Sequence, residues 1–196
     1  MVRLRFSLIL FLGALLAAQV QEKSAPVATQ SVITIKAFKS GLFSGFAHDH
    51  VIVAPIAHAE IDPGRPSAEI TVVTKEMKVA DKEASDKDRA EIQSTMLGPK
   101  VLDQEKYPEI RFKSSRIEQV SPQHYRVTGT LELHGTRQEM TFEVSEVGGH
   151  YRGSTKLKQS DFGIKPISLF GGSVKVKDQL ELELDVLAPA PAKASR

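Results

Sequence analysis

Hydrophobic and polar residues alternate with a period of two along most of the chain between residues 31 and 187. The clearest run is Leu180, Leu182, Leu184 and Val186, whose intervening positions are acidic. Such alternation is typical of strands that bury one face and expose the other to water. We therefore expect strands over residues 31–39, 51–61, 69–72, 109–120, 127–133, 139–145, 150–159 and 180–186.

One segment departs from this alternation and predicts a helix. Ser85-Asp86-Lys87-Asp88 has the form of a helix start that is capped by its own side chains. Ile92 and Met96 then fall near helical spacing, and Gly98-Pro99 ends the run. We expect one short helix, Asp86–Leu97, among about eight strands. Successive strands with short turns and a single helix favour an all-β antiparallel barrel or sandwich.

The two ends of the chain have a different character. Met1–Arg5 is basic and Phe6–Leu16 is mostly apolar, which is the pattern of a secretory signal peptide. The expectation is a signal peptide over 1–18, a flexible lead-in over 19–30 and a single domain over 31–187. A disordered tail rich in Pro and Ala would follow at 188–196. The protein is then expected to be periplasmic or secreted, with no membrane span once the signal is removed.

Composition excludes several classes of function. The 196 residues include no Cys, so there is no disulfide, cysteine nucleophile or Cys-ligated metal. The signal segment holds two of the 26 basic residues, which leaves 24 against 24 acidic ones. A neutral, mixed surface gives no reason to expect nucleic acid as a partner. The expected state is a monomer or homodimer.

The interior of such a barrel would be apolar. A barrel of eight strands is just wide enough to be filled by side chains or to hold one small ligand. Small or flexible residues at the expected inward positions, namely Ala57, Ala59, Gly129 and Met140, are compatible with a hollow interior. The alternative is a barrel with a filled core and a purely structural role.

Four ordered motifs resemble those of the YceI-like family of lipocalin-like polyisoprenoid-binding proteins. The most specific is the segment Tyr107–Ser115, YPEIRFKSS. An Arg-containing helix start, Asp88-Arg89, precedes it. The segment Val127–Thr136, VTGTLELHGT, and the turn Ser160–Ile164, SDFGI, follow it.

The resemblance implies an elongated, lipocalin-like antiparallel barrel of eight strands that is exported and not an enzyme. It also implies an apolar tunnel for an isoprenoid or other long-chain amphiphilic lipid, without a cofactor. Phe43 and Phe46, beside glycines, are expected at the tunnel entrance. The residues expected to line the tunnel are Ile70, Val72, Phe112, Leu131, Leu133, Met140, Phe142, Val144, Leu182 and Leu184.

Charged groups could bind the polar head of such a ligand. Arg89 and Lys165 are candidates because cations bind phosphate oxygens by charge-assisted hydrogen bonds. His48 and His50 are further head-group candidates. In an extended chain they share a face, which gives the alternative of a metal-binding module or metal-dependent enzyme. Neither a catalytic triad pattern nor a phosphate-binding loop accompanies them, so no catalytic residue is predicted.

Overall fold

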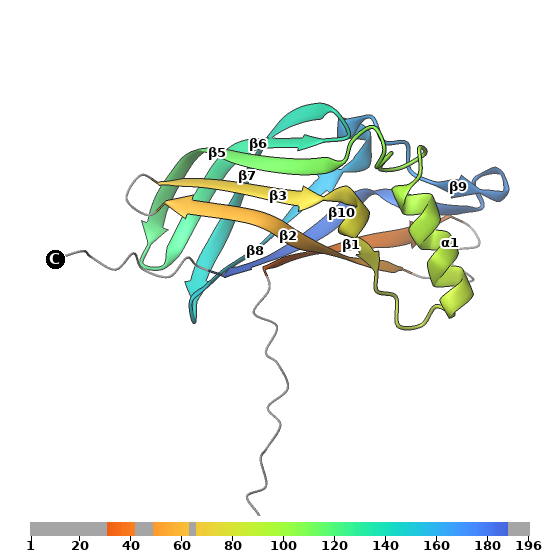
Figure 1. Ribbon diagram of the computed structural model, residues 1–196, viewed down its shortest axis with the longest axis horizontal. Helices are drawn as coiled ribbons and strands as arrows, with labels where there is room; N and C mark the ends of the chain where they lie inside the picture. The colour runs from red at the N-terminus through yellow and green to blue at the C-terminus, as the bar shows by residue number, and fades with distance from the viewer. Residues whose placement is uncertain (1–30, 42–48, 63–65, 188–196) are drawn as a thin grey trace, which may run out of the picture.

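Eight long strands form a closed, elongated antiparallel barrel (Figure 1). The structure is a computed structural model that describes residues 31–41, 49–62 and 66–187. Around the barrel the order is β1-β10-β8-β7-β6-β5-β3-β2, and β2 pairs with β1 to close it. The predicted antiparallel barrel is therefore confirmed. Its strands are β1 (Val32–Ser40), β2 (His50–Asp62), β3 (Ser67–Val73), β5 (Glu109–Ser121), β6 (His124–Leu133), β7 (Thr136–Val147), β8 (His150–Lys158) and β10 (Val174–Leu187).

Each predicted strand is present, and the remaining elements are short. Two-residue strands β4 (Lys78–Val79) and β9 (Ser168–Leu169) pair with β2 and β10. They are too short to show an alternating pattern, so the sequence does not reveal them. Single turns of 3₁₀ helix, η2 (Thr74–Glu76), η3 (Gln159–Phe162) and η4 (Phe170–Gly172), complete the connections.

The predicted helix is present as α1 (Asp86–Leu97). Ser85 caps it, since its Oγ accepts a hydrogen bond from the Asp88 backbone N–H at 3.2 Å. No residue of α1 is fully buried. Two side-chain hydrogen bonds of Gln93 fix it to the barrel: Oε1 accepts from the Val79 N–H, and Nε2 donates to the Met77 carbonyl, both at 2.8 Å.

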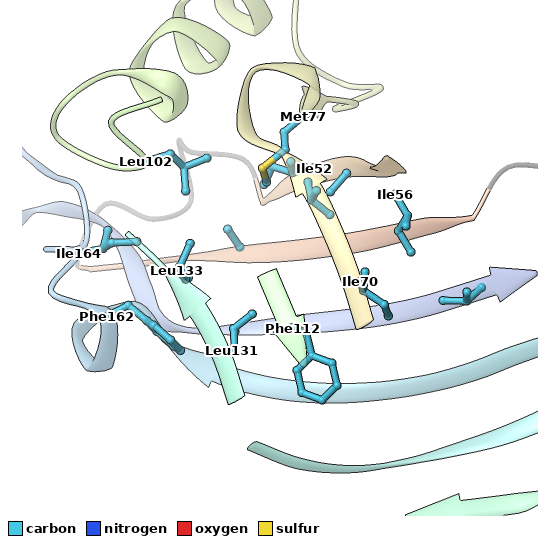
Figure 2. Close-up of a cluster of buried hydrophobic side chains, with 14 of the residues drawn as sticks. Ile52, Ile56, Ile70, Met77, Leu102, Phe112, Leu131, Leu133, Phe162 and Ile164 are labelled. Carbon is cyan, nitrogen blue, oxygen red and sulfur yellow. The ribbon is translucent and has the colours of Figure 1, made fainter. Parts of the chain in front are cut away.

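Helix α1 lies at one end of the barrel, which we call the helix end (Figure 1). At the opposite end, the terminal end, β1 begins and β10 finishes. The interior near the helix end is filled with side chains that point toward one another (Figure 2). Phe162 is only 2% exposed there, as expected for a residue that plugs the barrel. Its neighbours in this cluster include Met77, Leu102, Leu133 and Ile164.

A bulge in β2 changes which residues face inward. The register between β2 and β3 shifts between Ile56 and His58. Ala54 and Ile56 are buried before the shift, whereas Ala57 and Ala59 are exposed. Ala57 is the extra, unpaired residue of the bulge, so the expectation that it faces the interior is wrong. Beyond it the inward positions change to odd numbers, and Ala59 lies opposite the inward Ile70 but remains exposed.

Gly129 allows β5 and β6 to approach closely. A Cβ at this position would lie 2.5 Å from Cζ of Phe112 and 2.5 Å from the Lys113 carbonyl oxygen. The absent side chain thus leaves room for the Phe112 ring inside the barrel. The register of β5 against β6 also shifts here, between Ser114 and Arg116.

Strands β7 and β8 are paired over only part of their length. They pair only between Glu143–Val147 and His150–Ser154, near the terminal end. Toward the helix end, η3 bridges to β7 instead. The Gln138 amide donates to the Asp161 carbonyl at 2.9 Å, and the Thr136 hydroxyl donates to the Phe162 carbonyl at 3.5 Å.

Candidate functional site

The terminal half of the barrel encloses a cavity of about 300 Å³. It reaches the surface beside Pro66, Ser67 and Gln119, which are exposed residues near the turns of this end. Side chains from seven of the strands and from the β2–β3 connection surround it. They are Ile61, Asp62, Pro66, Ser67, Ala68, Ile70, Phe112, Ile117, Gln119, Tyr125, Val127, Phe142, Val144, Tyr151, Leu184 and Val186.

Three lining residues mark the inner limit of the cavity on their strands. Counted from the terminal end, the deepest lining residues include Ile70 on β3, Phe112 on β5 and Phe142 on β7. The Phe112 and Phe142 rings are tilted against each other, with their centroids 5.4 Å apart. Beyond this level the interior belongs to the filled helix half (Figure 2).

The residues predicted to line a tunnel divide between these two halves. Ile70, Phe112, Phe142, Val144 and Leu184 line the cavity. The other five lie deeper and do not line it. Of these, Val72, Leu131 and Leu133 are buried in the core, Met140 is half-buried against it, and Leu182 is half-buried on β10.

Several lining residues were absent from the predicted set. Tyr125 and Val127 share the alternation of Leu131 on β6, and Val186 shares that of Leu184 on β10. The same alternation could therefore have identified them. Tyr151 could not be identified in this way, because most residues of β8 are small or polar and show no alternation of apolar and polar positions.

Two tyrosines give the cavity a polar side, and the Glu146 carboxylate lies next to them without lining the cavity. The Tyr125 and Tyr151 rings meet edge to face, with centroids 6.0 Å apart. The Tyr125 hydroxyl donates a long hydrogen bond of 3.4 Å to the Glu146 carboxylate. Burial raises the pKa of the Tyr151 phenol, and the Glu146 and Tyr125 charges raise it further. Tyr151 therefore stays neutral and can donate a hydrogen bond at physiological pH.

Of the predicted head-group residues, the three that the structure describes, His50, Arg89 and Lys165, do not line this cavity. His50 and Arg89 lie at the helix end, where both contact the buried Asp81. The His50 Nδ1 is 2.7 Å from Asp81 Oδ2, and Arg89 donates to the Asp81 backbone carbonyl. Strand β2 carries the chain from His50 to Asp62, a length of roughly 40 Å. Lys165 is exposed in the loop between η3 and β9.

Asp81 gives this cluster a structural role. It is 4% exposed, and its Oδ1 accepts a hydrogen bond of 2.6 Å from the Val51 backbone N–H. A buried carboxylate needs hydrogen-bond partners, and His50 and the Val51 N–H supply them here. Asp81 thereby ties the segment before α1 to the start of β2. His50 and Arg89 thus lie away from this cavity, and their role as head-group residues stays a prediction.

The other predicted site residues are those of the tunnel entrance and of the alternative metal site. Phe43, Phe46 and His48 lie outside the described residues. Within the described part of the chain, no group of three or more His, Asp or Glu residues is placed to hold a metal ion. The alternative metal site at His48 and His50 therefore stays a prediction. No helix in the described ranges is long and apolar enough to cross a membrane.

Comparisons with known proteins agree with this architecture. The family model of the YceI-like domain matches residues 24–188. A UPF0312 protein of Pseudomonas putida (strain W619) is 30% identical over 95 residues, which are 43% of this chain and 46% of that protein. The chain thus matches less than half the length of this curated relative.

A solved structure shows the same fold at low sequence identity. The crystal structure of BcnA from Burkholderia cenocepacia has a TM-score of 0.58 at 18% identity, covering 80% of this chain and 96% of that one. The YCEI protein of Campylobacter jejuni has a TM-score of 0.49 at 14% identity, covering 68% of this chain and 80% of that one.

Proposed function

This chain belongs to the YceI-like family, and we propose that it is an exported carrier of an isoprenoid or another long-chain amphiphilic lipid. The observation that carries the proposal is the cavity of about 300 Å³ in the terminal half of the barrel. Most of its lining is aliphatic or aromatic, and it reaches the surface at one end. This is the shape and chemistry that a hydrocarbon tail requires.

The energetics of burying such a tail are sufficient for binding. Each methylene removed from water contributes about 0.8 kcal/mol. Ten buried carbons would then contribute about 8 kcal/mol, which corresponds to micromolar affinity before the costs of ordering the chain. Affinity can therefore come from the tail alone, without an ion pair to the head.

The head of the ligand would lie near the polar side of the cavity. The Tyr125 and Tyr151 hydroxyls and the Glu146 carboxylate are the groups that could form hydrogen bonds with it. The proposed function is binding and not catalysis, since these three groups do not form a nucleophile activated by a base. Export through the N-terminal segment is part of the proposal.

A cavity-filling variant tests the proposal. Ala68 lines the cavity, so Ala68→Phe places a ring where the tail would lie. We expect organic extraction and mass spectrometry to recover a stoichiometric apolar ligand from the native protein and at least tenfold less from this variant. Ala90→Phe is the matched control, because Ala90 is exposed on α1 and should retain the ligand.

The result that would contradict the carrier function is equally direct. If the native protein yields no apolar ligand and takes up none after delipidation, the cavity does not serve a lipid. Circular dichroism of all three proteins separates loss of ligand from loss of fold.

A further inference from the structure

Building on the carrier function proposed above, we propose that Phe112 and Phe142 form a floor that limits the buried part of the ligand's tail to about ten carbons. The two side chains come from strands that are separated in the wall by β6. Their rings nevertheless meet inside the barrel with centroids 5.4 Å apart. Both line the cavity, so a tail entering from the terminal end meets them at its deepest point.

The interior beyond these rings is occupied. Val72 is 3% exposed and Leu131 is 9% exposed, and both belong to the buried cluster without lining the cavity. Met140 follows Phe142 inward on β7 and packs against this cluster without lining the cavity. A longer tail therefore has no continuous path past the two phenylalanines.

Gly129 keeps one half of the floor in position. It lies on β6, the strand between the two phenylalanines, and a Cβ there would come within 2.5 Å of the Phe112 ring. The ring therefore rests directly over this backbone. Phe112 is 8% exposed, whereas Phe142 is only half-buried, so Phe142 is the member that can be truncated at lower cost to the fold.

The size of the cavity sets the length of the tail. A methylene group takes about the volume of a water molecule in the liquid, ~30 Å³. A cavity of about 300 Å³ then holds about ten such groups, or two isoprene units. Carbons beyond that number stay in water and add nothing to the affinity, so chain length becomes a determinant of specificity.

A series of linear 1-alkanols tests this limit on the delipidated full chain. Competition with radiolabelled 1-decanol in equilibrium dialysis gives the relative affinity at each length. For the native protein we expect affinity to rise about fourfold per methylene. The rise should stop near ten carbons and remain flat to fourteen.

Truncation of the floor should move this plateau. In Phe142→Ala the lost ring adds room for about three more carbons, so the plateau should shift toward thirteen. Phe38→Ala is the matched control, because Phe38 lies outside the buried cluster, with its ring 5.6 Å from the Lys177 amine. That variant should keep the native plateau. If Phe142→Ala fails to fold, Phe142→Leu should give a smaller shift in the same direction.

The outcomes separate the two proposals. Affinity that keeps rising through fourteen carbons in the native protein, or an unchanged plateau in both Phe142 variants, overturns the floor while leaving the carrier function intact. Absence of binding at every chain length overturns the carrier function and the floor together.

Discussion

Asp178 joins the last long strand to the turn η3 through one residue, Ser160. Its two carboxylate oxygens accept hydrogen bonds from the Ser160 backbone N–H at 2.8 Å and from the Ser160 hydroxyl at 2.6 Å. These bonds, aided by the charge of Lys158, hold the pKa of Asp178 below its ordinary value of 3.8. The folded state therefore favours the ionised carboxylate, which stabilises the fold above that pH.

Asp178→Asn should lower the free energy of unfolding at pH 7 by about 1 kcal/mol, because a partly exposed, charge-assisted hydrogen bond is weakened. The difference from the native protein should persist at pH 5 and shrink as the pH falls below 3.8. Urea unfolding at several pH values measures this difference.

Asp161→Asn is the matched control, since it removes a neighbouring exposed charge in η3. It should leave the free energy of unfolding nearly unchanged. A difference for Asp178→Asn that stays constant down to pH 3 would show that the carboxylate charge does not contribute.

Single residues also show where the sequence was informative about the site. The inward positions of Ile70, Phe112 and Leu184 follow from alternation alone, and all three line the cavity. His50 and Arg89 could not be placed in this way. A charge reveals that a side chain can bind an anion, but only the fold reveals that its partner is Asp81.

At the scale of elements, α1 depends on specific hydrogen bonds more than on an apolar face. Ile92, Met96 and Leu97 pack against the core but are only half-buried. Gln93 supplies the two hydrogen bonds that join α1 to Met77 and Val79. A helix with a small buried face needs such bonds to fix its position.

Gln93→Ala should therefore lower the free energy of unfolding by about 1–3 kcal/mol, because the Val79 N–H loses its acceptor. It should also accelerate hydrogen exchange of this amide before the barrel unfolds. Glu91→Ala, on the exposed face of α1, is the control and should change neither quantity. Unchanged protection of the Val79 amide in Gln93→Ala would contradict the anchoring role.

The sequence predicted these elements well wherever the pattern was long. The limits of α1 follow from Ser85, whose side chain caps its start, and from Gly98 at its end, and both roles are local. The bulge after Ile56 was not predictable, because it depends on the register against β3, a different part of the chain.

At the scale of the molecule, the strands of the barrel wall are hydrogen-bonded all the way round, but some neighbouring strands are paired over more residues than others. Strand β6 pairs along its length with β5 and β7, whereas β8 pairs with β7 only from His150 to Ser154. Local opening is favoured where fewer hydrogen bonds must break. We expect amides of β8 to exchange faster than those of β6 in hydrogen-exchange mass spectrometry. Equal protection of the two strands would contradict this ranking.

Whether the interior is hollow could not be predicted from the strands. Val127 and Leu131 have the same alternation on β6 and both are buried, yet only Val127 lines the cavity. The difference comes from connecting segments. Leu102, Phe162 and Ile164 lie between strands in the sequence and fill the barrel only at the helix end (Figure 2).

The first and last strands are neighbours in the wall, and the Leu187 backbone N–H donates to the Ser31 hydroxyl at 3.0 Å. The first and last residues of the described chain are therefore neighbours. The same barrel could form with the chain ends at another position in the sequence. A circular permutant could be joined there and cut at Gly148-Gly149, where an added Cβ would meet no atom within 4 Å. For protein engineering, this barrel can accept a new point of attachment without rearrangement of its wall.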